Sequence, residues 1–247
     1  MNRNVLLFYS FIVMTLSVFA FNADAKTQKT SELTRKEVFN LVNEAYTHFC
    51  EKRSSLETCS IESPYTFNYQ FFNMDQDAEN ELITSVNFTH HLGIFCVFDV
   101  INGKYKMIYH DSRHVTGWDF NHTYPLKGHT IFKLHTSTGG IGVEVHSDLL
   151  FYVQNQKFVI AWEGITQESD FTAYPGRTVP FTQKECTYEI RRKTLVLNYR
   201  CKINRQDPAT YHSIDKTPIT TIKKFQFKNT KFAQSTAKML TQLFRKS

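Results

Sequence analysis

Four oxygen-bearing side chains recur at short intervals in one polar segment of the chain. Asn73, Asp75, Asp77 and Glu81 occupy positions 1, 3, 5 and 9 of this segment. Alternate residues of a tight loop direct their side chains toward a common centre, and calcium prefers several oxygen ligands arranged in this way. The spacing therefore predicts a loop that binds a cation, calcium, with these four residues as metal ligands.

The segment from Asn73 to Ile83 resembles the calcium loop of integrin-type propeller repeats, the FG-GAP and VCBS-like repeats, which also occurs singly in secreted bacterial β proteins. The usual pattern is Asp-x-Asp/Asn-x-Asp-Gly-x-x-Glu followed by an aliphatic residue. Two positions depart from it, because Asn73 carries no charge and Ala78 replaces the glycine that allows a left-handed turn. The pattern does not recur, so a full propeller is not expected. The alternative is a loop shaped by Asx turns, with solvated carboxylates.

Histidines offer a second route to metal chemistry. Eight of the ten lie between His90 and His146. A metal hydrolase needs two or three histidines on one small patch beside a carboxylate, but the chain contains no His-Glu-x-x-His pair. Surface and strand-face positions explain most of the cluster, and a hydrolase that combines the acidic loop with these histidines is an alternative function.

The five cysteines suggest two disulfides and one free thiol. Spacing favours Cys50 with Cys59 and Cys186 with Cys201, the second pair bridging adjacent strands, although four cysteines allow three connectivities. Cys96 lies in an apolar strand segment and is expected to be a buried small hydrophobic residue rather than a nucleophile.

The N-terminal segment has the pattern of a secretory signal peptide. Arg3 precedes an apolar core from Val5 to Phe21, and Ala23-Asp24-Ala25 resembles a cleavage site. We expect residues 1–25 to be removed and the mature chain to be periplasmic or secreted, where disulfides persist. A single membrane anchor is the rival interpretation, and no later stretch is apolar enough to cross a bilayer.

Positive charge is concentrated near the C-terminus. The chain has a formal net charge of +6, and the segment from Lys216 to Ser247 contains eight basic and no acidic residues. Such a segment is either a solvated face or a contact with an anionic partner, such as a membrane surface, a cell-wall polymer or an acidic protein. Nucleic acid is not expected, because no recognition motif for it is present.

Local patterns predict a helix at each end and antiparallel strands between them. Thr34 and Glu37 form a capping box before apolar residues at helical spacing. Asn102-Gly103 is a strong hairpin signal, Gln154-Asn155-Gln156 is a polar turn, and Thr138 to Gly142 is expected to be a tight turn or bulge. The segment from Lys231 to Lys246 has an apolar helical face. Strands are expected at Tyr65–Phe72, Glu81–Phe88, Gly93–Val100, Lys104–Tyr109, Thr130–His135, Gly142–His146, Leu149–Val153, Phe158–Trp162, Cys186–Arg191, Leu195–Ile203 and Ile222–Phe227.

These elements predict an α+β fold, mainly antiparallel β, in which meander sheets are covered by an N-terminal and a C-terminal packing helix. Residues 26–247 show no linker and no repeat, which favours one mainly-β domain. Because no nucleophile elbow, kinase set or zinc finger is present, we expect an exported, non-enzymatic binding protein, compatible with a periplasmic immunity or inhibitor role. A metal-dependent hydrolase and a structural envelope component are the alternatives.

Overall fold

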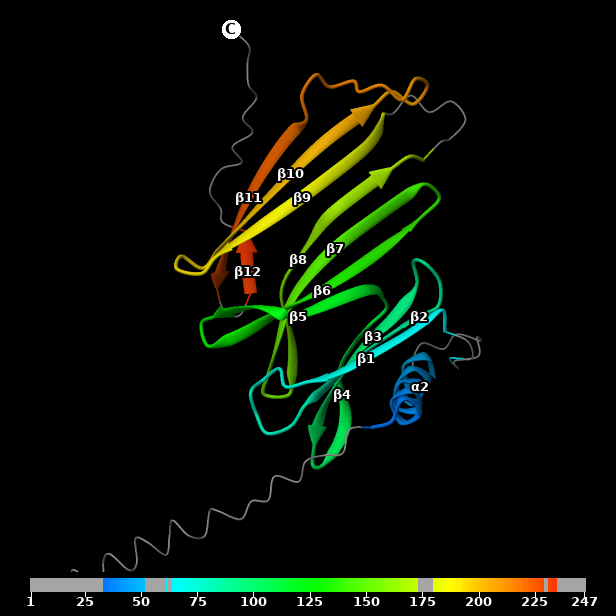
Figure 1. Cartoon of the computed structure of the whole chain (residues 1–247), viewed down its shortest axis with the longest axis vertical. Helices are drawn as coiled ribbons and strands as arrows, with labels where there is room; N and C mark the ends of the chain where they lie inside the picture. Colours follow the sequence, from blue (N-terminus) through cyan, green and yellow to red (C-terminus); the bar gives the residue numbers. More distant parts are fainter. Residues whose placement is uncertain (1–32, 52–60, 62–63, 173–179, 229–230, 235–247) are drawn as a thin grey trace, which may run out of the picture. The chain divides into compact units, whose positions relative to one another are not determined.

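The computed structural model describes residues 33–51, 61, 64–172, 180–228 and 231–234, and these form one helix and twelve strands. Every strand pair is antiparallel, which confirms the mainly antiparallel β prediction. Sheet A contains, in order, β1 (Thr66–Phe72), β2 (Glu81–Asn87), β3 (Gly93–Ile101) and β4 (Lys104–Asp111). Sheet B runs from β5 to β12 in chain order (Figure 1): β5 (His114–Leu126), β6 (His129–Gly140), β7 (Val143–Gln154), β8 (Lys157–Asp170), β9 (Phe181–Arg191), β10 (Val196–Gln206), β11 (Ile219–Lys228) and β12 (Lys231–Gln234).

The helix α2 (Arg35–Glu51) begins at the predicted capping box. The backbone N–H of Thr34 donates to Oε2 of Glu37 at 2.7 Å, and the N–H of Glu37 donates to Oγ1 of Thr34 at 3.4 Å. These two bonds satisfy donors that the first turn of a helix leaves without intrahelical partners. The helix therefore starts where the local sequence predicts it.

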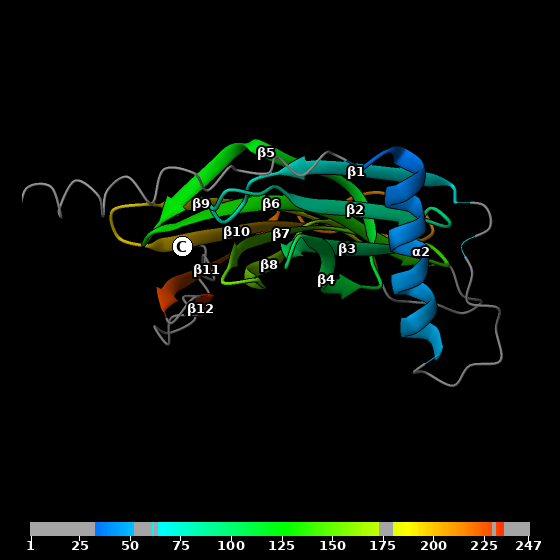
Figure 2. The same cartoon turned by 90° about the horizontal axis from the view of Figure 1, so that it is seen from below.

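Sheet A lies between α2 and sheet B. On one face, Val38 and Val42 of α2 pack against Leu82 and Val86 of β2, and Figure 2 shows the helix crossing the strands. The other face packs against sheet B through a separate cluster that includes Phe95 of sheet A. All residues of β2 and nearly all of β3 are buried for this reason. An apolar strand without alternation is what burial on both faces requires.

The predicted turns are present. Asn102 and Gly103 both have positive φ, 57° and 73°, and they join β3 to β4 as the hairpin signal predicts. Asn155 and Gln156 also have positive φ and join β7 to β8. Ile141 and Gly142, with φ of 51° and 82°, form a tight turn between β6 and β7, whereas Thr138 to Gly140 of the glycine-rich segment belong to β6.

Sheet B opens between β8 and β9. β8 pairs with β7 along most of its length, but with β9 only over Gln167 to Asp170. Trp162 of β8 packs in the interior with Tyr199 of β10 and Phe232 of β12. Cys186 of β9 and Cys201 of β10 are direct cross-strand neighbours and form a disulfide, which confirms this predicted pair.

Two elements differ from the prediction. β5 occupies a region in which no strand was expected from the sequence, because its register shifts twice against β6 and breaks the period-two pattern. The predicted C-terminal helix is wrong for Lys231 to Gln234, which form β12, with Phe232 opposite Phe227 of β11. Residues 235–247 of that predicted helix lie outside the described residues.

Several predictions fall outside the described part of the chain. They concern the signal peptide, Cys59 and the side chain of Cys50, so the pairing of Cys50 with Cys59 stays a prediction. Among the described residues, no helix has the length and apolar character needed to span a membrane.

Candidate metal centre

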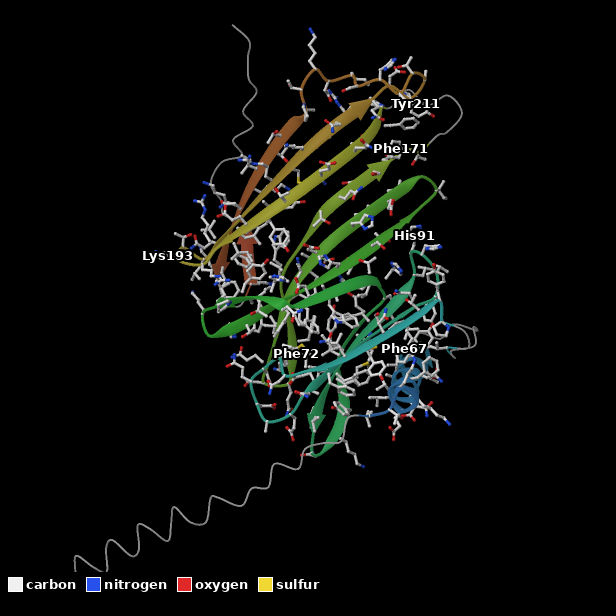
Figure 3. All side chains as sticks on the ribbon, in the orientation of Figure 1. Phe67, Phe72, His91, Phe171, Lys193 and Tyr211 are labelled. Atoms are coloured by element: carbon white, nitrogen blue, oxygen red, sulfur yellow. A yellow bond between two sulfur atoms is a disulfide. The ribbon has the colours of Figure 1, made fainter. Side chains whose placement is uncertain are left out.

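The acidic loop, residues Asn73 to Glu81, connects β1 to β2 and is shaped by its own side chains. Phe72, labelled in Figure 3, is the last residue of β1. Oδ1 of Asn73 accepts from the N–H of Gln76 at 2.7 Å, and its Nδ2 donates to the carbonyl of Asp77 at 2.6 Å. Oδ1 of Asp77 accepts from the N–H of Glu79 at 2.8 Å. The loop therefore uses the Asx turns that such residues favour.

The left-handed residue of this loop is Gln76, with φ of 70°, whereas Ala78 is not among the residues with positive φ. The replacement of the usual glycine by Ala78 therefore does not strain the backbone at that position. Asn73 supplies hydrogen bonds that close the turn, and this gives an uncharged residue a structural role at the first ligand position.

Three of the predicted metal ligands converge. One carboxylate oxygen from each of Asp75, Asp77 and Glu81 lies within 4.8 Å of the other two. Asp77 is exposed, Asp75 is half-buried and Glu81 is fully buried. Oε2 of Glu81 accepts from the N–H of Met74 at 2.5 Å, whereas its Oε1 is buried and has no hydrogen-bond partner among the described residues.

Asp99 of β3 adds a fourth carboxylate that sequence analysis did not select. The register that pairs Leu82 with Phe98 places Glu81 opposite Asp99 on the next strand. Asp99 is 1% exposed, and neither of its carboxylate oxygens has a hydrogen-bond partner within the part of the chain that the structure describes. A signal for it exists in the sequence, because Asp99 is the single acidic residue in the apolar run from Gly93 to Ile101.

The electrostatics of this cluster favour a bound cation. Burial raises the pKa of Glu81 to about 8, although the Met74 N–H opposes the shift, and the negative charge of Asp75 raises it further. Burial also raises the pKa of Asp99 to about 6. The nearby N–H of Val100 lowers this pKa without completing a hydrogen bond. The negative charges of Asp75, Asp77 and Glu79 raise it further. A buried carboxylate without a partner is unfavourable unless it is protonated or binds a cation. The residues therefore fit a divalent ion.

The loop is attached to the rest of the molecule through Met74, Gln76 and Asn80, whose carbonyl accepts from the hydroxyl of Tyr105 in β4 at 3.3 Å. Met74 is 2% exposed and packs in the cluster between the two sheets. Nε2 of Gln76 donates to Oγ1 of Thr130 in β6 at 3.1 Å. Beside the loop, a hollow of about 450 Å³ is lined by Asp75 and Asp77 and by turns of sheet B that include His129 and Asn155.

The clustered histidines are distributed over several sites rather than gathered at the loop. His114 Nδ1 lies 2.6 Å from Oγ of Ser137, and His146 Nε2 lies 2.9 Å from Oε1 of Glu144. His129 borders the hollow but stacks on Tyr152 at a centroid distance of 4.3 Å. Among the described residues, the carboxylates of Asp75, Asp77 and Glu81 form the one converging group of metal-ligating side chains, and it contains no histidine.

A second buried carboxylate is fully satisfied. Asp148 of β7 is 6% exposed; its Oδ1 lies 2.6 Å from Nδ1 of His135, and its Oδ2 accepts from the hydroxyl of Tyr188 at 2.8 Å. These two hydrogen bonds hold the pKa of Asp148 below its usual value despite burial. The contrast with Asp99 is informative, because Asp148 is completely paired whereas Asp99 has no hydrogen-bond donor in the described part of the chain.

Cys96 is free and buried, as expected. Burial raises the pKa of its thiol to about 12, so the thiolate needed for nucleophilic attack is disfavoured.

Comparisons of the chain with protein-family models, with curated proteins and with solved structures found no match.

Proposed function

We propose that the protein is an exported binding protein whose acidic loop holds a divalent cation, calcium. The observation that carries this proposal is the convergence of Asp75, Asp77 and Glu81 beside the buried, unpartnered carboxylate of Asp99. Calcium accepts six to eight oxygen ligands in flexible geometry, which an irregular loop next to a strand can supply. The resemblance of Asn73 to Ile83 to the integrin-type calcium loop supports the same ion.

In this proposal the cation has a structural role with a functional consequence. It neutralises carboxylates that repel one another, and it fixes the position of Met74 in the cluster between the sheets. It also fixes the acidic wall of the hollow beside the loop. Cation binding would thus order the surface around this hollow, which the acidic loop and the neighbouring residues of sheet B present to a partner.

Thermal unfolding in excess chelator and then in millimolar calcium tests the proposal. A ligand bound by the native state alone stabilises it by about 2.7 kcal/mol at 100 times its dissociation constant. The midpoint should rise in the purified wild-type protein and in Glu44→Ala, a control at an exposed helix carboxylate. It should not rise in Asp75→Ala. An equal midpoint with and without calcium in wild-type protein would refute the cation site.

Export and a role in binding rest on separate observations. The signal-peptide pattern of residues 1–25 and the Cys186–Cys201 disulfide support an oxidising compartment. Histidines engaged away from the acidic loop and a buried free thiol favour binding over catalysis. An immunity or inhibitor protein of the periplasm is compatible with this description.

One observation favours the hydrolase alternative. His129 borders the same hollow as Asp75 and Asp77, so a metal-bound water there would lie near an imidazole. Assays with phosphate-ester, peptide and glycoside substrates in calcium, zinc and manganese would support it if any turnover disappeared in His129→Gln. Absence of turnover with every metal leaves the binding role, whereas turnover that survives this substitution would mean a catalytic site that does not use His129.

A further inference from the structure

The outward face of β9, β10 and β11 carries a row of cationic side chains. On β10, the exposed Arg200 and Lys202 alternate with the buried Tyr199 and Cys201. The register places Arg200 between Thr187 of β9 and Ile222 of β11, and it places Asn198 between Glu189 and Lys224. Directly paired residues point to the same side of a sheet. The basic groups of three strands therefore share one face.

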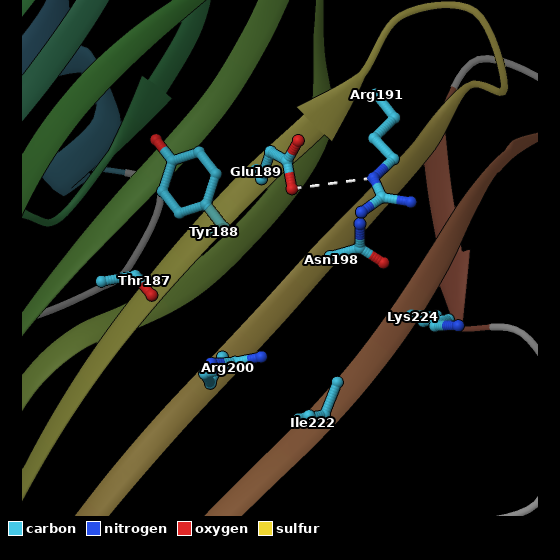
Figure 4. A pocket seen from close by; sticks show the side chains of 8 residues that line it. All are labelled: Thr187, Tyr188, Glu189, Arg191, Asn198, Arg200, Ile222 and Lys224. Atoms are coloured by element: carbon cyan, nitrogen blue, oxygen red, sulfur yellow. Dashed lines mark ion pairs between the residues drawn. The ribbon is translucent and has the colours of Figure 1, made fainter.

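This face is hollowed rather than flat. A hollow of about 390 Å³ is lined by residues that include Arg191, Asn198, Arg200, Ile222 and Lys224, and Figure 4 shows them on three neighbouring strands. Glu189 lies 3.6 Å from Arg191 and partly offsets it, and both side chains are more than 60% exposed. Arg200 and Lys224 form no ion pair with any described residue. Two cations are thus available to a ligand.

The surrounding charge has the same sign. Residues 181–234 contain twelve basic and four acidic side chains, whereas residues 66–111 contain two basic and six acidic ones. The basic hairpin between β9 and β10 includes Lys193, labelled in Figure 3, and continues the row beyond Arg191. Glu185, which pairs with Lys202 on this face, and Glu189 offset part of the charge, but the remaining excess of cations attracts ligands of opposite charge.

We propose that this face, called here the basic groove, binds an acidic polysaccharide. Two residues of a strand span about 6.8 Å, so Arg200 and Lys202 are spaced along β10 in a way that suits neighbouring anionic groups of a polymer. Arginine pairs with carboxylates and sulfates through two parallel hydrogen bonds. The amide of Asn198 and the hydroxyl of Thr187 can bond sugar hydroxyls. Ile222, 48% exposed, offers an apolar surface to a sugar ring.

Binding of two defined polymers tests the basic groove. The purified protein is titrated with heparin, which is sulfated, and with polygalacturonate, which is carboxylated, at low and moderate salt. Arg200→Glu combined with Lys224→Glu should weaken binding by about tenfold or more, and the milder Gln pair should weaken it less. Lys36→Glu with Lys104→Glu makes the same change of charge at exposed sites elsewhere and should change binding less than about twofold.

Circular dichroism confirms that each variant is folded. If Arg200→Glu with Lys224→Glu does not fold, Arg200→Gln with Lys224→Gln replaces it in the test. Absence of binding to both polymers at low salt would overturn the proposal, as would an equal loss in the control pair. Tighter binding of duplex DNA, or of phosphatidylglycerol vesicles, at the same charge concentration would also overturn it in favour of that class of partner. The titrations are carried out in chelator, because calcium cross-links polygalacturonate, and the result is then independent of the cation site.

Discussion

Glu81 of β2 and Asp99 of β3 lie opposite each other in the register of sheet A, and three of their four carboxylate oxygens are buried without a hydrogen-bond donor among the described residues. Strands β2 and β3 are buried on both faces, so water does not reach these oxygens. The arrangement is unfavourable for two ionised carboxylates, and a bound cation would make it favourable.

Asp99→Asn should have opposite effects in the absence and in the presence of calcium. In chelator it removes a negative charge from a buried acidic cluster, so we expect the free energy of unfolding at neutral pH to rise by about 1–3 kcal/mol. In calcium it removes a favourable charge, so calcium affinity should fall. Urea unfolding in the two solutions measures both effects. Destabilisation in chelator would show that the Asp99 carboxylate has a protein partner after all.

Stability should depend on pH in chelator, and this dependence should disappear when calcium is added. The folded-state pKa values of Glu81 and Asp99 are raised to about 8 and about 6, above the values near 4 of unfolded carboxylates. Their protonated forms thus stabilise the native state at low pH, and this contribution is lost as pH rises through the folded pKa values.

In chelator, stability should therefore fall by about 1–3 kcal/mol between about pH 5 and about pH 8, whereas in calcium the fall should disappear because the ion binds the charged forms. Denaturant midpoints at the two pH values measure this, and the Glu81→Gln, Asp99→Asn double variant should show no fall in chelator. Stability that rises with pH in chelator would contradict the raised pKa values.

The bond between Tyr188 and Asp148 should contribute more than a comparable bond to a neutral acceptor. Tyr188→Phe leaves the ionised carboxylate of Asp148 without its hydroxyl donor, and we expect a loss of about 1.5–3 kcal/mol. Tyr199 is the matched control, because its hydroxyl donates to the neutral carbonyl of Ile165 at 2.6 Å, and Tyr199→Phe should cost about 0.5–1.5 kcal/mol. Equal losses in the two variants would mean that the charge of Asp148 does not strengthen its bond.

The disulfide between Cys186 and Cys201 should stabilise the strands that carry the basic groove. The two cysteines are 15 residues apart, and closing a loop of that length contributes about 3 kcal/mol in the chain-entropy model. Cys186→Ala with Cys201→Ala should lower the free energy of unfolding by about 2–4 kcal/mol, and reduction of the wild-type protein should have a similar effect. A difference below about 0.5 kcal/mol would mean that strand pairing alone holds β9 to β10.

Local signals predicted the elements whose structure is determined locally. The capping box of α2 and the Asn102-Gly103 hairpin depend on residues a few positions apart, and the structure contains both. The two strands expected at Gly142–His146 and Leu149–Val153 form one continuous β7, because an irregular pairing at His146 and Ser147 carries the strand past the polar interruption.

Long-range pairing explains what sequence patterns missed. β5 lacks a regular alternation, and its position is set by β6. Phe232 has helical spacing to later apolar residues, yet it pairs with Phe227, at a centroid distance of 5.2 Å, because β11 presents an edge that a following strand can join. The acidic loop was recognisable from its spacing, whereas Asp99 joins it through the pairing of β2 with β3. Spacing along the chain therefore revealed the converging carboxylates of one loop, but it did not reveal the buried carboxylate on the neighbouring strand.

Calorimetric titration of the chelator-treated, dialysed protein with calcium chloride tests the central claim most directly. We expect saturable binding of one ion per chain, retained in Glu44→Ala and lost in Asp75→Asn combined with Asp77→Asn. Binding should be weaker in Asp99→Asn. No saturable heat in the wild-type protein, or binding that the Asp75 and Asp77 substitutions leave unchanged, would contradict this claim.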